Sequence, residues 1–477
     1  MSDRHVEEKQ TLRERVLHGG AYLAVRQGMG VGLAFVGMLL LTRIIGPVGY
    51  GLYFTAFGIA IFLSQVSRFG VDVFLVRRKQ APDDAVYHQA FSFLLLSSTG
   101  LALLGLALSP LMGRWLGDSR VLAPLWALLG ILPLTVLSAP PIARLERVLD
   151  YRKVAGVELV EQITYYSIAL VLAVAGFGVW ALVAGYALSQ VWLVLASHVV
   201  ARYRPAWRWS APLVKEMLTY GSTYSASGWI WQLRPLATSL IVGRYLGPEG
   251  VAFVALSSRI IEGLSFIKTA TYRLSIAALA QVQHDYPRLR AALEEAMALQ
   301  ILALGPLLAG FALVAPWLIP LLYGEQWRPA LLVYPFIALG VLVNSVFNMH
   351  SSVLYVLEDN MQVSLFVAVH VTLLAIGGFI FVPRFGLVGW GLAELAALLS
   401  YFVIHFQVKR RFSFSYLRAL PWLVVFAPPL FVPLVGFPFG LVLWLSLLAI
   451  PFSWAARAQI QEYWTFVRRR STWPVSH

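Results

Sequence analysis

The sequence contains no cysteine, which excludes disulfide bonds, thiolate metal sites and cysteine nucleophiles. Charged residues are also scarce: they make up 13% of the 477 residues, whereas a soluble domain carries about 25%. Hydrophobic residues reach 59% instead, and no long polar stretch remains for a separate soluble domain. The composition therefore predicts an all-α integral membrane protein whose function lies among its helices.

Apolar segments long enough to cross a bilayer recur along the whole chain. We expect about 14 transmembrane helices, of which the thirteenth is interrupted by several prolines that membrane helices tolerate. The predicted spans cover approximately residues 20–42, 50–70, 88–109, 120–140, 156–176, 178–199, 217–242, 250–273, 293–318, 331–355, 362–382, 387–407, 419–435 and 437–456.

Lysines and arginines are distributed unevenly between the two sides of this predicted bundle. With the N-terminus placed in the cytoplasm, 25 of the 37 fall in cytoplasmic segments and six in external loops. Because basic residues accumulate in cytoplasmic loops, we expect both termini to be cytoplasmic. The net charge of +14 is then explained by loops facing anionic headgroups, with no nucleic-acid partner. The charged N-terminal segment is not expected to be a cleaved signal peptide.

The two halves of the chain share short motifs at nearly constant spacing, which predicts an internal repeat. Arg43-Ile-Ile-Gly-Pro-Val-Gly49 corresponds to Arg244-Tyr-Leu-Gly-Pro-Glu-Gly250 and Gly20 to Gly221 at an offset of 201, and Phe177-Gly-Val corresponds to Phe385-Gly-Leu at an offset of 208. We therefore expect a six-helix lobe over residues 1–208, a second over 209–408, and a helix hairpin with a cytoplasmic tail over 409–477. Each lobe holds an even number of spans, so the repeats are parallel, as in some transporters.

Arg26 lies inside the first predicted span, where a fixed charge is costly and is therefore a candidate functional group. Four glycines follow it on the same helix, at positions 28, 30, 32 and 37. They leave little bulk to resist bending and allow close approach to a neighbouring helix, so we predict a movable first helix. Two alternatives remain for Arg26: it faces a central cavity, or it snorkels to the cytoplasmic interface.

Other charges inside the spans fall into two groups. Arg234, beside the helix-breaking Pro235, has no acidic residue at helical spacing and is a second cavity candidate. Arg68 with Asp72 and Arg259 with Glu262 are spaced either to line a cavity or to form intrahelical ion pairs. The fifth span carries Glu158 and Glu161, which either line a cavity or neutralise Arg152 and Lys153 nearby. The isolated His350, His370 and Glu394 are more typical of hydrogen-bonded helix contacts.

Three segments together resemble a known family. They are Leu41–Tyr53 (LTRIIGPVGYGLY), Ala143–Lys153 (ARLERVLDYRK) and Gly176–Leu182 (GFGVWAL). With the arrangement of spans, they make the chain similar to the polysaccharide flippases of the Wzx type. These belong to a superfamily that also holds multidrug and toxin extruders and lipid II flippases, and the resemblance covers nearly the whole chain.

The resemblance implies two six-helix lobes in a V around a central cavity, plus a C-terminal helix pair that holds a lipid tail in lipid II flippases. It implies transport of an undecaprenyl-pyrophosphate-linked oligosaccharide to the outer leaflet of a bacterial inner membrane, in association with membrane lipids and the polysaccharide polymerase machinery. The substrate-binding candidates in comparable places are Arg26, Arg68, Arg234 and Arg259. Arginine suits a pyrophosphate because its charge is permanent and its hydrogen bonds are bidentate.

The candidates for coupling to a proton or a sodium ion are Asp72, Glu158, Glu161 and Glu262. We expect no catalytic residues, no metal site and no cofactor. The alternatives within the superfamily are a cation-coupled multidrug exporter and a lipid II flippase. An enzyme such as a polysaccharide polymerase is disfavoured, because the longest external connections, near residues 110–119 and 319–330, are too short for a catalytic region.

Overall fold

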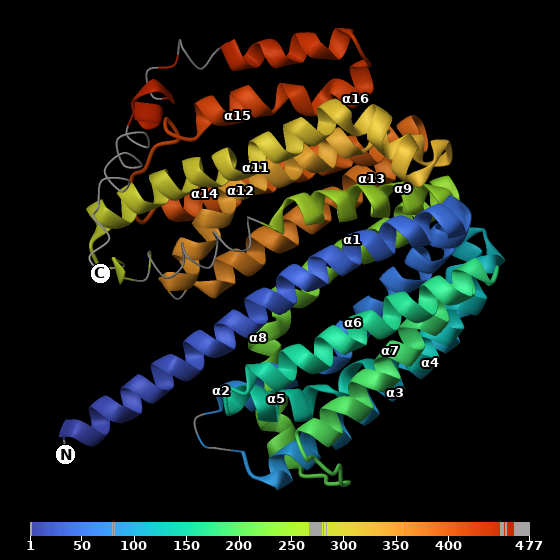
Figure 1. The fold of residues 1–477 in the computed structure, drawn as a ribbon, viewed down its shortest axis with the longest axis vertical. Coiled ribbons are helices and arrows are strands. Elements are labelled where there is room, and N and C mark those ends of the chain that lie inside the picture. The colour runs from blue at the N-terminus through green and yellow to red at the C-terminus, as the bar shows by residue number, and fades with distance from the viewer. Residues whose placement is uncertain are drawn as a thin grey trace, which may run out of the picture. The chain divides into compact units, whose positions relative to one another are not determined.

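The computed structural model describes residues 2–78, 80, 82–266, 279, 281–282, 284–357, 359–448, 453 and 456–461, without the side chains of 2–27, 222–228 and 360. The described residues form helices and their connections, with no β-strand among them. Contacts divide the chain into two compact units, residues 1–252 and 253–477, which are described separately (Figure 1).

The first unit is a bundle of long helices (Figure 1). Aspartates precede several of them and cap their first turns. The Asp83 carboxylate accepts a hydrogen bond from the Val86 backbone N–H, and the Asp150 carboxylate accepts one from the Lys153 backbone N–H. The elements are α1 (Ser2–Arg68), α2 (Val71–Arg77), α3 (Asp84–Leu116), η1 (Ser119–Val121), α4 (Leu122–Leu137), α5 (Ala139–Arg147), α6 (Tyr151–Val174), α7 (Val179–Val200), α8 (Ala211–Ala237), the π-helical turn η2 (Thr238–Val242) and the start of α9 (Gly243–Leu264).

The second unit contains the rest of α9 and the remaining helices. Its C-terminal elements pack on α11, where the Phe426 ring lies against Gly305 in a space that a larger residue would fill. The elements are α11 (Tyr286–Tyr323), η3 (Glu325–Leu332), α12 (Tyr334–Val356), α13 (Asn360–Ala397), η4 (Leu398–Ser400), α14 (Tyr401–Lys409), α15 (Leu420–Phe426), η5 (Pro428–Phe431), α16 (Val432–Val435) and η6 (Phe439–Leu448).

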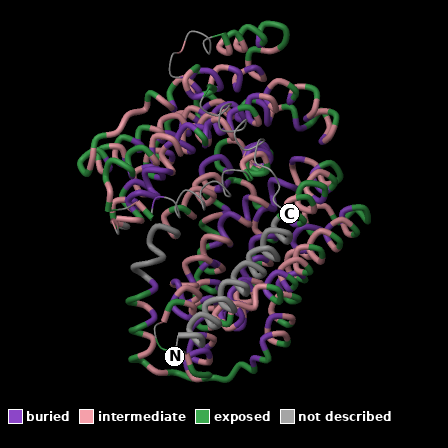
Figure 2. Tube along the Cα trace, turned by 60° about the vertical axis from the view of Figure 1, so that its left-hand side comes forward, coloured by how far each residue is buried: buried purple, intermediate pink, exposed green. Residues whose placement is uncertain are grey.

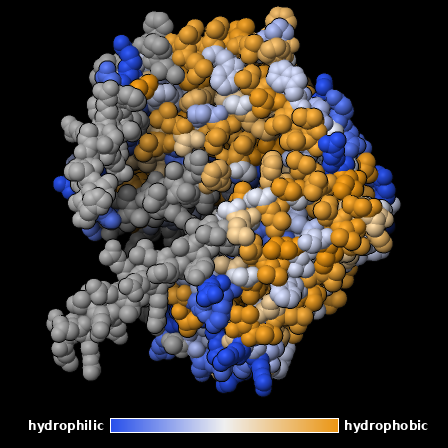
Figure 3. All heavy atoms as spheres, viewed as in Figure 1, coloured by the Kyte–Doolittle hydropathy of each residue, from blue (hydrophilic) through white to orange (hydrophobic). Residues whose placement is uncertain are grey.

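Nine segments of the described chain are long and apolar enough to cross a membrane. Three of them, Gly28–Arg77, Trp229–Leu264 and Met361–Lys409, each overlap two predicted spans, and the C-terminal stretches Leu420–Val435 and Phe439–Leu448 are apolar but shorter. The all-α membrane architecture is therefore confirmed, while the count of fourteen stays a prediction. Apolar side chains cover most of the visible face, and hydrophilic ones gather mainly toward the ends of the helices (Figure 3).

The predicted repeat has matching backbone conformations at its signature glycines. Gly46 (φ 75°, ψ 172°) and Gly247 (φ 68°, ψ −172°) interrupt α1 and α9 at equivalent motif positions. Gly178 (φ 54°, ψ −126°) and Gly386 (φ 60°, ψ −132°) match in the same way. Only glycine adopts such positive φ values readily, so the same turn recurs where the sequence motif recurs. The lobe boundaries at residues 208 and 408 stay a prediction.

One end of the first unit has a dense apolar core where α2, α3, α5 and α8 meet. Its fully buried members include Val71, Leu75, Leu94 and Met217. Buried residues lie along helix faces turned toward neighbouring helices, while the outward faces are exposed (Figure 2). Large apolar side chains on those outward faces, such as Val174 at 72% exposure, are suited to contact lipid.

Candidate functional site

The first helix approaches α6 through two of its glycines. The Gln162 amide donates to the Gly30 carbonyl oxygen at 2.8 Å, and the Tyr166 ring occupies the space that a side chain at Gly37 would need. The other two glycines of this run have open space beside them. The predicted close approach is thus confirmed for one face of the helix. Arg26 lies in α1, but its side chain is outside the described residues, so both alternatives for it stay predictions.

Arg68 ends α1 and ties it to α4. Its Nη2 donates to the carbonyl oxygen of Thr135 at 2.6 Å, and the hydroxyls of Ser64 and Thr135 are also 2.6 Å apart. The Nε–H of Arg68 is buried and has no acceptor within the part of the chain that the structure describes. This unused donor of a half-buried guanidinium can bind an additional anionic partner.

The expectation of an intrahelical pair between Arg68 and Asp72 is wrong. Phe69 (φ 44°) and Gly70 (φ 67°) both adopt left-handed backbone conformations, which end α1 and start α2. The two charged residues therefore lie on different helices and lose their i, i+4 relation. No ion pair joins them in the described part of the chain.

The structure brings several predicted site residues together in the first unit. Tyr186 of α7 interacts electrostatically with both Arg68 and Glu161, and Gln190 donates to a Glu161 carboxylate oxygen at 3.3 Å. Arg68 of α1 and Glu161 of α6 thus both lie within electrostatic range of the same tyrosine. Neither Tyr186 nor Gln190 is a candidate from the sequence, because both lie in α7, which is mostly apolar and carries no acidic or basic residue other than His198.

A second cluster contains the other two acidic candidates of this unit. Glu146 of α5 interacts electrostatically with Glu158 of α6 and with Asp72 of α2. The sequence reading missed Glu146, which lies in one of the family-like segments. Lys153 pairs with Asp150, with Nζ and the carboxylate oxygen 2.6 Å apart, rather than with the acidic residues of the span. Among the described residues, no group of three or more His, Asp or Glu side chains could hold a metal ion.

Arg234 is half-buried on α8, with its guanidinium carbon 6.0 Å from the centre of the Trp231 ring. Pro235 follows it, and the helix then loosens into the π-helical turn η2, a distortion often found at functional positions. The helix lies against the second half of α1: Trp229 Nε1 donates to the Gln65 carbonyl at 3.1 Å. The role of Arg234 in substrate binding stays a prediction.

Arg259 lies in the second unit, on α9. Its Nη1 is 3.1 Å from a carboxylate oxygen of Glu262, and both side chains are exposed. The intrahelical ion pair considered from the sequence is therefore present. The binding role of Arg259 and the coupling role of Glu262 both stay predictions.

The isolated histidines of the second unit are hydrogen-bonded contacts, as expected. Tyr416, in the connection between α14 and α15, links His350 to His405, because its hydroxyl lies 3.0 Å from Nε2 of His350 and 2.7 Å from Nδ1 of His405. His370 lies 3.0 Å from the Ser400 hydroxyl. The network fastens the connection that leads to the C-terminal elements onto α12 and α14.

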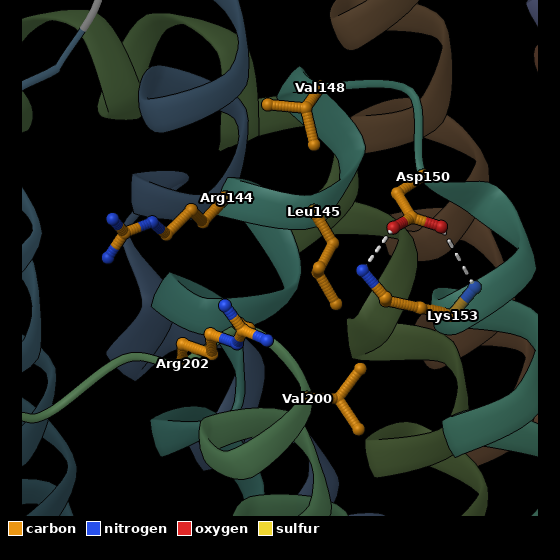
Figure 4. A pocket seen from close by; sticks show the side chains of 8 residues that line it. Arg144, Leu145, Val148, Asp150, Lys153, Val200 and Arg202 are labelled. Atoms are coloured by element: carbon orange, nitrogen blue, oxygen red, sulfur yellow. Dashed lines mark hydrogen bonds and ion pairs between the residues drawn. The ribbon is translucent and has the colours of Figure 1, made fainter.

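Basic residues also organise one end of the first unit, which the sequence reading treated only as cytoplasmic loops. Arg147 donates hydrogen bonds to the carbonyl oxygens of Leu75, Val76 and Arg78 at 2.8–3.2 Å and so caps the end of α2. Beside it, a pocket of about 540 Å³ opens where α5 ends and α6 begins (Figure 4). The residues that build this pocket come from sequence positions about fifty residues apart.

A family model described as polysaccharide biosynthesis protein matches residues 40–332. The chain is 24% identical over 353 residues to the lipopolysaccharide biosynthesis protein WzxC of Escherichia coli, an alignment that covers 72% of this chain and 70% of WzxC. It is 24% identical over 314 residues to the succinoglycan biosynthesis transport protein ExoT of Rhizobium meliloti, which covers 65% of this chain and 63% of ExoT.

Solved structures share the fold at low sequence identity. The lipid II flippase MurJ in an inward closed conformation superposes with a TM-score of 0.69 at 16% identity, covering 90% of this chain and 98% of MurJ. An inward-facing multidrug resistance MATE family transporter gives a TM-score of 0.59 at 16% identity, covering 82% and 98%. The predicted all-helical, multi-pass membrane fold is thus confirmed, and it is the fold of these transporters. As its sequence segments indicated, the chain belongs to the polysaccharide biosynthesis protein family.

Proposed function

We propose that this protein is a flippase that moves an undecaprenyl-pyrophosphate-linked oligosaccharide from the cytoplasmic to the outer leaflet by alternating access. The names of its relatives concern lipopolysaccharide and succinoglycan biosynthesis, and the name of ExoT states transport. A polar head on a lipid carrier is the form in which such a saccharide reaches a membrane transporter. Its tail stays in the bilayer while the head crosses inside the protein.

The observation that carries the proposal is the half-buried side chain of Arg68, whose buried Nε–H donor is unused in the described part of the chain. A pyrophosphate cannot cross hydrocarbon without compensation, because burying an unpaired charge is prohibitive. Arginine offers permanent charge and several donors to phosphate oxygens. Arg26, Arg234 and Arg259 are the further arginines that we assign to the same anionic head.

The membrane potential supplies a driving force that does not require a coupled ion. For a head with two net negative charges, a potential of 100 mV, inside negative, favours outward movement by roughly 4 to 5 kcal/mol. For an ion-coupled mechanism we assign Glu161 first, because Glu161 and Arg68 both act electrostatically on Tyr186. Asp72, Glu158 and Glu262 complete the set of coupling candidates.

The test is reconstitution into vesicles with a pyrophosphate-linked oligosaccharide lipid, with exposure in the outer leaflet followed with and without an imposed potential or proton gradient. Arg68→Ala, Arg234→Ala and Arg26→Ala should each slow flipping by roughly 10- to 100-fold, the value of one or two charge-assisted hydrogen bonds. Arg328→Ala is the matched control, because Arg328 is exposed and pairs with Glu325 in its own turn at 3.0 Å.

Membrane abundance and apparent Tm of each variant separate loss of transport from loss of folding, and Arg68→Lys keeps the charge without the planar donors. Wild-type rates for all three alanine variants would contradict the assignment of the arginines. The likeness to MurJ makes lipid II the second substrate to test in the same vesicles. Efflux of cationic drugs, with no movement of either lipid, would instead favour the multidrug exporter.

A further inference from the structure

A basic pocket of about 540 Å³ lies at one end of the first unit, between the end of α5, the start of α6 and the end of α7 (Figure 4). Arg144, Lys153 and Arg202 line it together with a single carboxylate, Asp150. The pocket therefore carries an excess of positive charge. It also lies where three helices leave their apolar segments, the level at which lipid headgroups are found.

The three cations differ in how far protein groups compensate them. Lys153 Nζ lies 2.6 Å from the Asp150 carboxylate, and Arg144 Nη1 lies 3.2 Å from the exposed carboxylate of Asp84. Arg202 makes no ion pair and no side-chain hydrogen bond with any residue in the described ranges. Its donors are the ones left for a ligand.

The backbone at Arg202 adopts a conformation that usually belongs to glycine. The helix α7 ends in a Schellman motif, in which Tyr203 N–H donates to the His198 carbonyl and Arg202 N–H to the Val199 carbonyl. Arg202 occupies the left-handed position of this motif, with φ 49°. At the end of α6 the same motif has Gly176 in that position, with φ 86°. An arginine is thus present at a position where glycine would be less strained.

Tyr203 holds Arg202 in place. Its side chain is buried, its hydroxyl lies 3.2 Å from Nδ1 of His88, and its ring lies 5.5 Å from the rings of His88 and His198. Burial raises the pKa of the Tyr203 hydroxyl, so the group stays protonated and neutral. The residue that follows Arg202 is thus anchored in the core, and the Arg202 side chain lines the pocket together with Leu145 (Figure 4).

The rest of the pocket is apolar. Leu145 and Ala201 are buried in its floor as part of the core at this end of the unit. Val148 lines the pocket and is 63% exposed, and the neighbouring Val199 is 75% exposed. One cation without an ion pair, Arg202, beside exposed aliphatic side chains suits a ligand that combines an anion with a hydrocarbon chain.

We propose that this pocket binds the phosphate headgroup of an anionic membrane phospholipid, with Arg202 as its main contact and the acyl chains along Val148 and Val199. The general chemistry is a phosphate ester on an apolar chain, and basic pockets between membrane helices bind lipid headgroups in this way. The site is separate from the proposed transport of a saccharide. It gives the protein a bound lipid that is not its cargo.

The experiment uses native mass spectrometry of the full chain in nonionic detergent, titrated with phosphatidylglycerol in the absence of any transport substrate. We expect a retained lipid whose Kd rises about tenfold in Arg202→Gln, the loss of one charge-assisted contact. Arg202→Lys should lose less, and Arg202→Gly should bind as weakly as Arg202→Gln while remaining folded. Arg204→Gln is the matched control, since Arg204 is exposed, lies in the same segment and does not line the pocket.

Equal weakening by Arg204→Gln and Arg202→Gln would overturn the proposal, because it would show only an effect of net charge. Equal affinity for phosphatidylcholine would overturn it as well, since the cations would then not select an anionic head. Displacement of the lipid by inorganic phosphate at equal concentration would show that the acyl chains contribute nothing and would refute the lipid assignment. A protein that binds phosphatidylglycerol as expected but flips no saccharide would refute the proposed function alone.

Discussion

The replacement Arg202→Gly offers a direct measure of how much the helix end at α7 is strained. Arg202 is the left-handed residue of a Schellman motif, with φ 49°, and its side chain is exposed. Removing the side chain therefore loses little packing inside the protein. Relief of the backbone is the main effect that remains, and it acts to stabilise the fold.

The size of this effect follows from two opposing contributions. A left-handed conformation costs a residue other than glycine roughly 1–2 kcal/mol, which Arg202→Gly removes. Glycine also gives the unfolded chain more conformational freedom, which lowers the free energy of unfolding by roughly 0.5–1 kcal/mol. The net expectation is a stabilisation of about 0.5–1 kcal/mol. For a unit of this size that corresponds to a rise in apparent Tm of roughly 1–2 °C.

The assay is thermal unfolding followed by tryptophan fluorescence, in nonionic detergent without anionic lipid. The matched control is Gly176→Ala, at the same position of the same motif on α6. A Cβ at Gly176 would meet no atom within 4 Å, so that variant tests the backbone conformation alone. By the same two contributions, it should lower the apparent Tm by roughly 1–2 °C. The two variants are thus expected to have opposite signs.

A lower Tm for Arg202→Gly, together with the expected loss in Gly176→Ala, would refute this reasoning. It would mean that the Arg202 side chain stabilises the protein itself by more than the strain of its backbone. With phosphatidylglycerol present, the wild type should have a higher apparent Tm than Arg202→Gly. The wild type then gains the binding energy of the lipid, and Arg202→Gly does not.

Two further predictions concern other parts of the first unit. Gly37→Ala should destabilise the protein by about 1–3 kcal/mol, because its side chain would overlap a tyrosine ring on α6. Its control, Gly32→Ala, has open space beside it and should be neutral or stabilising. Equal Tm values for the two variants would contradict the contact between Gly37 and α6. Hydrogen bonds from the Arg120 guanidinium lower the pKa of Asp118. The stabilising contribution of Asp118 is therefore complete above the ordinary pKa of about 4 and is lost as the pH falls through the lowered value. Asp118→Asn should flatten the acid side of the stability profile, and an unchanged profile would contradict the assignment.

Local sequence signals predicted the features that depend on the backbone of a few residues. Gly46 and Gly247 lie in motifs of the same length, and both take up the left-handed turn that only glycine enters readily. Gly178 and Gly386 do the same at the second motif. Each turn depends on residues next to one another in the chain. The repeat was therefore visible before any tertiary contact was known.

The polar stripe of the second span was predicted less well. Helical periodicity placed Arg68 and Asp72 on one face, but a turn at Phe69 and Gly70 separates them. Gly70 in the sequence indicates that the helix can end there, whereas nothing in the sequence indicates that Phe69 takes up a positive φ of 44°. The actual partner of Arg68 is the backbone carbonyl of Thr135, on another helix. Periodicity within one segment carries no information about such a partner.

The basic pocket was out of reach for the same reason. Arg144 and Lys153 flank one turn, but Arg202 lies at the end of a helix about fifty residues later. Only packing of α5, α6 and α7 brings them together, through a buried core that includes Leu145 and Tyr203. The count of basic residues predicted a charged end of the bundle. It did not indicate which of these basic residues would line a common pocket.

The first unit thus holds two arginines whose placement is costly for different reasons. Arg68 is costly because a donor of its guanidinium is buried without an acceptor, and Arg202 because its backbone is left-handed. A bound anion offsets the cost at Arg68 directly, because it accepts the unused hydrogen bond. At Arg202 the anion leaves the backbone strain unchanged and stabilises the protein only by binding a side chain that glycine would lack. Replacing Arg68 should therefore weaken binding of an anion among the helices of the first unit. Replacing Arg202 should weaken binding of an anion at the end of those helices. Variants of Arg68 and of Arg202 should therefore affect different measurements, saccharide flipping for Arg68 and phospholipid binding for Arg202.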